Sequence, residues 1–515
     1  MTPPEAARPA PDQPGLRLHT ARGRWVIAAA VLGAGIVMID GTVVNVALPA
    51  IGATFHSSLA TLQWTVTAYT LTLASFILVG GSIGDRYGRR RSFVVGVLWF
   101  AVASLLCGVA PNATVLIAAR ALQGVGAALL TPESLAMLQA TFHPDDRAQA
   151  IGTWSGVSGI AAAVGPFIGG YLIQTVSWRL IFLINLPLVV AVVWIAERHV
   201  PETSDPTSVG RRLDMTGAVL ATIGLGALIY GLIQGANVGW TQTGVVAALV
   251  AATATGVAFV LVERRVAHPM LPLGIFRSRQ FTGANIVTFM VYGALGGALF
   301  LVPIQLQQVL GYSPLEAGTA LLPITIVMLA LSARAGKLSQ RIGPRIPMTV
   351  GPIVAGAGLA ALSLVQAGTS YWTTFLPAML LFSFGLALTV SPLTATVLAA
   401  APGEHAGLAS AVNNAVARAA GLIAVAVLPA AAGLSASSYL DPVAFGSGFR
   451  TATLLAGAAC ALGGVLSAFT IRREPATPQI AEESSRFACP VDAPPWCGAE
   501  GAEPVAAGRQ SRPAA

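Results

Sequence analysis

The chain has 515 residues, of which 55% are hydrophobic and only 10% are charged. Because a soluble domain carries about 25% charged residues, this composition argues against a soluble enzyme. The 29 basic residues outnumber the 21 acidic ones, but they lie between apolar runs instead of forming the basic face that nucleic-acid binding requires. We therefore expect a membrane protein, with the lipid bilayer as a partner and no nucleic acid.

Uncharged apolar runs recur along the whole chain. Each run has 19 to 28 residues, which is enough to cross a bilayer core of about 30 Å as a helix. They predict an all-α polytopic membrane protein with fourteen transmembrane helices. The predicted starts are Trp25, Thr61, Ser92, Thr114, Ala148, Trp178, Met215, Gln242, Phe281, Leu315, Ile346, Tyr371, His405 and Arg450.

The basic residues also predict the orientation. They precede the first span and follow the second, fourth, sixth, eighth, tenth and fourteenth, whereas the connections after spans one, three, seven, nine and eleven carry no Lys or Arg. Because cytoplasmic loops are enriched in Lys and Arg, we expect a bacterial plasma-membrane protein with both termini in the cytoplasm. The first 24 residues lack an apolar core, so no cleavable signal peptide is expected, and the four cysteines show no metal-binding spacing.

One internal repeat divides the chain. Gly81-Ser-Ile-Gly-Asp85-Arg86-Tyr-Gly88-Arg-Arg90 matches Gly336-Lys-Leu-Ser-Gln340-Arg341-Ile-Gly343-Pro-Arg345 at its Gly and Arg positions. Each copy follows the second span of a six-helix set, and repeated halves are typical of secondary transporters; the alternative is two unrelated basic loops. The predicted divisions are a cytoplasmic tail (1–24), a first six-helix bundle (25–197), a linker with two additional helices (198–280), a second six-helix bundle (281–471) and a disordered cytoplasmic tail (472–515).

Several motifs resemble the major facilitator superfamily, in particular its fourteen-helix drug:proton antiporter branch. The segment from Gly81 to Arg91 is similar to the signature between helices 2 and 3. Further similar segments are 116–126 in helix 4, 156–170 in helix 5, and the branch marks 40–49, 63–69 and 178–187 in helices 1, 2 and 6. Two positions depart from the pattern: Gln340 replaces an acid, and Glu133 stands where a small residue is expected.

The resemblance implies a conformational latch in the loop that contains Asp85, Arg86, Arg89 and Arg90. Asp85 would meet Arg86 and the positive N-terminus of a second-half helix near His405. The alternative is a solvated surface charge.

Helix 5 is the predicted hinge. Gly156, Gly165 and Gly169 would leave a face of small residues for close helix packing, and Pro166 would bend the helix by removing a backbone hydrogen bond. Ordinary tight packing, with no part in conformational exchange, is the alternative.

Charged residues deep inside spans are the main functional signal, because an ionisable side chain at the bilayer centre costs about 2.5 to 3.5 kcal/mol and normally faces a partner or a cavity. Asp40 and Arg120 lie about 12 to 14 Å below the same predicted surface by helix rise. We expect them to pair, so that the proton occupancy of Asp40 depends on the distance to Arg120; a purely structural ion pair is the alternative. Glu133 is a second proton site or a counter-ion for a cationic substrate.

Other polar residues of the spans are assigned to a substrate cavity. They are Asn45, Tyr69, Gln123, Asn285, Asn413, Asn414 and Arg418. Three glutamines at the end of the ninth span, Gln305, Gln307 and Gln308, fit equally well as a polar cluster at the outer rim.

The energy source is expected to be a proton gradient, since the chain contains no G-x-x-x-x-G-K-[ST] loop for ATP. The leading hypothesis is a monomeric, proton-coupled efflux transporter of amphipathic small molecules such as drugs or antibiotics, with no cofactor and no catalytic residue. A transporter of one endogenous metabolite, running as a symporter, is the alternative. A receptor that has kept a transporter fold is disfavoured because the C-terminal tail is too short for a signalling domain.

Overall fold

The computed structural model describes residues 15–204, 214–266, 269, 271, 273–400, 406–434 and 441–472. These residues form helices joined by short connections. The helices are α1 Ala21–Phe55, α2 Leu59–Tyr87, α3 Arg89–Gly108, α4 Ala113–Thr141, α5 Pro144–Thr175, α6 Leu180–Leu183, α7 Asn185–His199, α8 Met215–Val238, α9 Thr243–Glu263, η2 Leu273–Arg277, α10 Arg279–Ile304, η3 Gln305–Val309, α11 Pro314–Ala320, α12 Leu322–Ile342, α13 Arg345–Leu362, η4 Tyr371–Phe375, α14 Leu376–Ala399, α15 Ala406–Ala431 and α16 Pro442–Thr470.

The predicted all-α membrane fold is confirmed. Within the described part of the chain, thirteen helical segments are long and apolar enough to cross a membrane, and α2 makes a fourteenth although it bends by 48° between Leu59–Ile77 and Val79–Tyr87. Short helices join longer ones to complete several spans, as α6 and α7 do in the predicted sixth span.

Some predicted helix bounds are wrong. The last span begins at Pro442 behind the N-cap Asp441, so Arg450, its predicted start, lies eight residues inside α16. Arg450 is exposed there, as expected for a long basic side chain that reaches towards the membrane surface near a helix end. Helix α1 begins at Ala21 because Thr20 caps it, and it runs for 35 residues. The predicted start at His405 and the tail from 473 lie outside the described residues.

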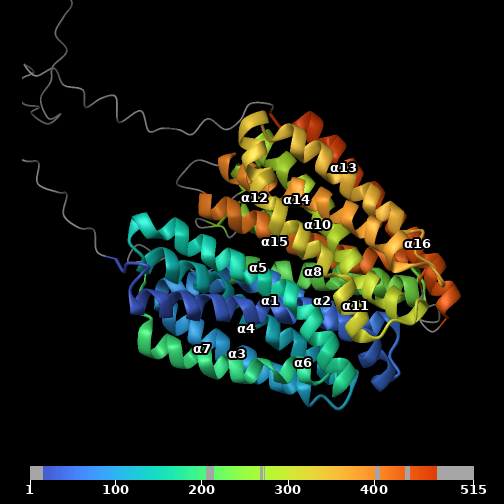
Figure 1. The fold of residues 1–515 in the computed structure, drawn as a ribbon, viewed down its shortest axis with the longest axis horizontal. Helices are drawn as coiled ribbons and strands as arrows, with labels where there is room; N and C mark the ends of the chain where they lie inside the picture. Colours follow the sequence, from blue (N-terminus) through green and yellow to red (C-terminus); the bar gives the residue numbers. More distant parts are fainter. Residues whose placement is uncertain are drawn as a thin grey trace, which may run out of the picture. The chain divides into compact units, whose positions relative to one another are not determined.

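The helices pack as two sets (Figure 1). In the first set, α1 contacts α5 and α7, while α4 lies against α2 and α3; in the second, α13 contacts α14 and α16, and α10 contacts α15. Close packing in the first set depends on glycines of α4, because a side chain at Gly124 would overlap Thr72 and the backbone of α2, and one at Gly126 would overlap Phe100. Small residues permit this backbone approach in a membrane, where apolar surface alone drives no association.

The additional helices α8 and α9 form a hairpin beside these sets. They pack on each other, and α8 contacts both α2 of the first set and α15 of the second. Helix α9 has only Val245 and Glu263 buried among its residues. The hairpin therefore lies along the line where α2 meets α15, with α9 on its outer side.

The two sets meet along two seams, α2 with α15 and α5 with α11 and α12. Gln63 Nε2 donates to the Val425 carbonyl at 2.7 Å, and Gln307 Nε2 donates to the Val46 carbonyl at 2.9 Å. Both hydrogen bonds join the sets near the end where α1 ends and α2 begins. We call the other end, which carries Asp85 and Arg86 to Arg91, the arginine-rich end. Hydrogen bonds thus close the gap between the two helix sets at the end opposite to the arginine-rich end.

We predict that Gln307→Ala weakens this closure. The variant loses one hydrogen bond of about 1 kcal/mol, so the ratio of open to closed molecules should rise about fivefold. Distances between spin labels placed on α1 and α11 near this end measure that ratio.

Gln305→Ala is the matched control, because Gln305 Nε2 donates to the Val365 carbonyl inside the second set. It should lower the melting temperature without changing the spin-label distances. An equal opening in both variants would contradict the assignment of Gln307 to the closure.

Candidate functional site

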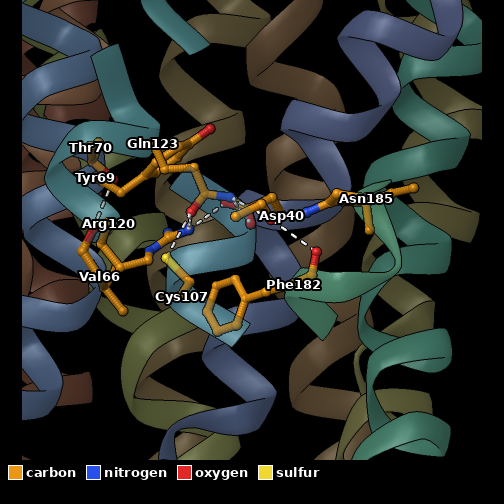
Figure 2. A network of polar contacts seen from close by, with 12 residues as sticks. Asp40, Val66, Tyr69, Thr70, Cys107, Arg120, Gln123, Phe182 and Asn185 are labelled. Atoms are coloured by element: carbon orange, nitrogen blue, oxygen red, sulfur yellow. Dashed lines mark hydrogen bonds and ion pairs between the residues drawn. The ribbon is translucent and has the colours of Figure 1, made fainter. Parts of the chain in front are cut away.

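A buried polar network joins α1 to α4 in the first set (Figure 2). Arg120 Nη1 donates to Asp40 Oδ2 at 2.5 Å and to Gln123 Oε1 at 2.6 Å, and Gln123 Nε2 donates to Asp40 Oδ1 at 2.9 Å. No side chain of the three is more than 1% exposed. The pair of Asp40 with Arg120, which we predicted from their equal depth in the membrane, is therefore present. Gln123, assigned from sequence to the substrate cavity, is instead enclosed in this network, since a residue three positions after Arg120 shares its helix face.

The network continues into α2, α3 and α7. Arg120 Nε donates to the Thr65 carbonyl at 3.2 Å, and Ser104 Oγ accepts from Gln123 at 3.3 Å and from Asn185 Nδ2 at 3.0 Å. Sequence reasoning missed Thr65 and Ser104 and treated Asn185 only as a family mark. Thr65 contributes its backbone carbonyl, which every residue has, and serine is common in membrane helices, so residue type gives no signal for these contacts.

Aromatic rings flank the guanidinium of Arg120. Its central carbon lies 4.2 Å from the centre of the Tyr69 ring and 5.7 Å from that of Phe182, distances at which a cation is attracted to a ring. The charge of Arg120 thus meets a carboxylate, an amide oxygen, a carbonyl and two rings. Removing one partner of a buried ion pair costs about 3 to 5 kcal/mol, so this network holds α1, α2 and α4 together and keeps water from Asp40.

A cavity of about 220 Å³ lies between the two helix sets, close to this network along α1. Thr42 and Asn45 line it from the first set, two and five residues beyond Asp40, and Tyr292 lines it from the second. Most of its remaining wall is aliphatic, with residues from α5, α10, α12 and α14. We refer to it as the central cavity. Of the residues that the sequence assigns to a substrate cavity, Asn45 lines this central cavity.

The other predicted cavity residues lie on the α2–α15 side. Tyr69 Oη and Arg418 Nε are buried without a hydrogen-bond partner in the described structure, and Arg418 is close enough to Tyr69 for an electrostatic interaction. Asn413 Nδ2 donates to Asn285 Oδ1 at 3.2 Å and to Thr288 Oγ1 at 2.6 Å. Asn413 and Asn285 therefore tie α15 to α10.

Asn414, the last member of the predicted cavity set, is exposed on α15. It does not line the central cavity.

Glu133 lies on α4 far from the Asp40 network, towards the arginine-rich end. Its side chain is fully buried, and neither carboxyl oxygen has a hydrogen-bond partner among the described residues. A side chain built at Gly84 of α2 would overlap this carboxyl group, which shows that Glu133 packs directly on α2. This position does not suit a counter-ion for a substrate in the central cavity. The interpretation of Glu133 as a second proton site stays a prediction.

The predicted glycine face of α5 is partly wrong. Gly165 packs on Ile39 and Thr42, and Gly169 packs on Val43, so both bring α5 close to α1. Gly156 is exposed, and a side chain there would meet no atom within 4 Å. The physical reason is helix phase, because nine residues at 100° each turn Gly156 about 180° away from Gly165. Pro166 lies within a continuous α5.

Pro166 also marks a contact with the second set. Its carbonyl lies against Gly318 of α11, where a side chain would overlap it. Gly318 therefore allows the close approach of α11 to α5, and no motif in the sequence singles it out. The role of α5 as a hinge stays a prediction.

In the described structure Asp85 binds Arg89 and not Arg86, the first of its two predicted partners. Its carboxylate accepts from Arg89 Nη2 at 2.7 Å and Nε at 3.0 Å, whereas the Arg86 guanidinium lies over the Tyr87 ring at 5.2 Å. Gly88, at φ 110°, makes the turn that returns Arg89 towards Asp85. The predicted partner helix end near His405 lies outside the described residues.

An acid that the sequence analysis missed completes this loop. The backbone N–H groups of Arg90 and Arg91 donate to the carboxylate of Glu202 at 3.0 and 3.2 Å, which places an anion at the N-terminus of α3. Arg90 Nη1 donates to the Val200 carbonyl. Arg90 thus binds the segment that follows α7, within its own helix set.

A protein-family model described as the Major Facilitator Superfamily matches residues 30–426. The chain belongs to the major facilitator superfamily. Proteins of this superfamily are membrane transporters and not enzymes; they bind small-molecule substrates and usually couple their movement to ions. The chain is accordingly a multi-pass membrane transporter.

Curated relatives within this superfamily are named for drug resistance. The chain is 35% identical to the multidrug resistance protein Stp of Mycobacterium tuberculosis over 412 residues, which cover 80% of the chain and 76% of the relative. It is 35% identical to the tetracenomycin C resistance and export protein of Streptomyces glaucescens over 423 residues, which cover 81% and 78% of the two chains.

Solved structures show the same superfamily fold. The inward-open xylose transporter XylE from E. coli is 14% identical and matches with a TM-score of 0.60, covering 87% of this chain and 96% of that chain. At this identity the similarity supports the fold alone.

We predict that Asp85→Asn leaves the protein in the membrane but slows transport at least threefold. The pair of Asp85 with Arg89 is partly exposed, so its loss should change stability by less than about 1 kcal/mol, while the loop loses its acid. Transport rates of purified protein in vesicles, at equal protein content, measure the effect.

Gln340→Ala is the control in the second half, because Gln340 is exposed and carries no charge. It should transport at nearly the rate of the unmodified protein. Normal rates in both variants would remove the latch hypothesis.

Proposed function

We propose that the protein is a proton-coupled exporter of amphipathic drugs or antibiotics across the plasma membrane, working by alternating access. The observation that carries the proposal is the buried Asp40–Arg120–Gln123 network beside the central cavity. The names of the relatives, which describe multidrug resistance and antibiotic export by those proteins, support the same direction and substrate class.

Proton binding is coupled to the change in conformation through the charge of Asp40. A proton that reaches Asp40 neutralises its carboxylate and leaves the Arg120 guanidinium without its counter-ion, which in a buried site costs several kcal/mol. Helices α1 and α4 then separate or admit water, and the change reaches the central cavity through Thr42 and Asn45 on α1. Release of the proton restores the ion pair. Asp40 is fully buried in this conformation, so proton exchange belongs to the other conformation.

The walls of the central cavity favour amphipathic substrates. Its aliphatic residues include Leu295, Ile324 and Met328, and its polar groups are few. A mostly apolar pocket with few polar groups holds molecules of varied shape by burying their apolar surface.

Arg418 favours a second candidate function. A guanidinium whose buried Nε lacks a partner in the described structure suits an anionic group of one endogenous metabolite, moved by symport or antiport. Resistance of a pump-deficient host to several unrelated compounds on expression supports the drug exporter; transport of one metabolite without any resistance supports the alternative.

We predict that Asp40→Asn abolishes proton-driven export, reducing substrate-induced proton release in reconstituted vesicles at least tenfold. The amide resembles the protonated carboxyl group but releases no proton. Substrate affinity, measured by binding to the purified protein, should stay within threefold because Asp40 does not line the central cavity.

A double variant separates coupling from stability. Asp40→Asn alone leaves Arg120 as an unpaired buried charge and can unfold the protein, whereas Asp40→Asn with Arg120→Gln removes both charges. We expect the double variant to fold and to exchange substrate for substrate without moving protons. Proton release at the normal ratio in the folded double variant would show that the pair is only structural.

The proposed orientation places the arginine-rich end and both termini in the cytoplasm, with the protein acting as a monomer. In a cysteine-free background, Ser204→Cys should react with an impermeant maleimide only in inside-out vesicles. Thr241→Cys, in the turn between α8 and α9, is the control and should react only in intact cells. Labelling of Ser204→Cys from outside would reverse the orientation.

A further inference from the structure

A second cavity, of about 530 Å³, lies between the α8–α9 hairpin and the α2–α15 seam. Helix α2 contributes Ala74 and Ser75, just before its bend, and α15 contributes Val412 among others. The remaining lining comes from α8, α9 and the segment before α10. We call it the lateral cavity, and its volume lies in the range of about 300 to 1,000 Å³ typical of ligand sites.

The lining determines which chemistry the lateral cavity accepts. It contains no charged residue, and its polar side chains are the hydroxyls of Ser75 and Thr253. Thr253 already donates to the Leu249 carbonyl, whereas Ser75 Oγ is buried without a hydrogen-bond partner in the described structure. One unpaired hydroxyl in an otherwise apolar wall leaves the cavity suited mainly to hydrocarbon.

The position of the cavity determines where this hydrocarbon comes from. Thr253 and Gly256, which line it from α9, are exposed, and the outer side of α9 faces lipid in a membrane. The surroundings from which the cavity fills are therefore acyl chains and not water.

Arginines follow closely in sequence after two residues that line the lateral cavity. Phe276 lines it and Arg277 follows directly; Phe259 lines it and Arg264 comes five residues later, about 7.5 Å along α9. Arg264, Arg265, Arg277 and Arg279 are all exposed, and none of them forms an ion pair with an acid in the described residues. Basic side chains near the membrane surface attract anionic lipid headgroups.

We propose that the lateral cavity binds one acyl chain of an anionic phospholipid, whose phosphate meets these arginines. The chain contacts α2 of the first set, α15 of the second and the hairpin between them. The hairpin thus has a function of its own: it encloses a lipid against the moving seam, and the lipid stabilises the conformation in which this cavity is present.

The test is photolabelling of the full-length protein in vesicles that contain phosphatidylglycerol with a diazirine in its acyl chain. We expect cross-links at Val412, which is 1% exposed and therefore out of reach of bulk lipid. Gly256→Leu should reduce them at least fivefold by filling the cavity, since a side chain there meets no atom within 4 Å. Gly244→Leu, on the same helix but outside the lining, is the matched control and should leave them unchanged.

Three results would overturn the proposal. They are the absence of cross-links at Val412, undiminished cross-links in Gly256→Leu, and displacement of the label by a transported compound, which would make the cavity part of the substrate path. Phosphatidylcholine with the same diazirine should label at most a third as strongly; equal labelling would overturn the anionic headgroup. Labelling is measured without transport, so a failure here is distinct from a failure of the proposed drug export.

Discussion

The ion pair of Asp40 with Arg120 is the interaction on which the rest of the first helix set depends. Two opposite charges in an apolar interior are stable only together and with further hydrogen bonds, and here Gln123 and the Thr65 carbonyl supply them. This requirement fixes the faces of α1, α2 and α4 that meet. The glycines of α4 then allow the helices to approach closely enough for the contacts to form.

The same constraint links the network to the seams between the sets. Helix α1 carries Asp40, lines the central cavity through Asn45 and offers the Val46 carbonyl to Gln307 of the second set. One rigid helix therefore connects the charge, the cavity and the closure at one end. A change in charge at Asp40 can reach the closure without any long chain of side-chain contacts, because these sites lie within seven consecutive residues of one helix.

The α8–α9 hairpin adds a different kind of control. It takes no part in the buried ion pair, but α8 contacts the seam helices of both sets. In a membrane, the space between a hairpin and a moving seam fills with hydrocarbon. The proposed lipid in the lateral cavity would expose the transporter to the composition of its own bilayer, whereas the proposed coupling at Asp40 would make it respond to protons.

The sequence by itself determined the spans and the partnership of Asp40 with Arg120, because hydropathy and the cost of burying a lone charge act locally along the chain. Only the tertiary structure decided that Arg89 binds Asp85, that Glu202 caps α3, that Gln307 closes the seam and that Gly156 lies off the packed face of α5. These contacts depend on the rotation of each helix about its axis and on which helices become neighbours. Packing between distant segments fixes both, and no local pattern in the sequence records it.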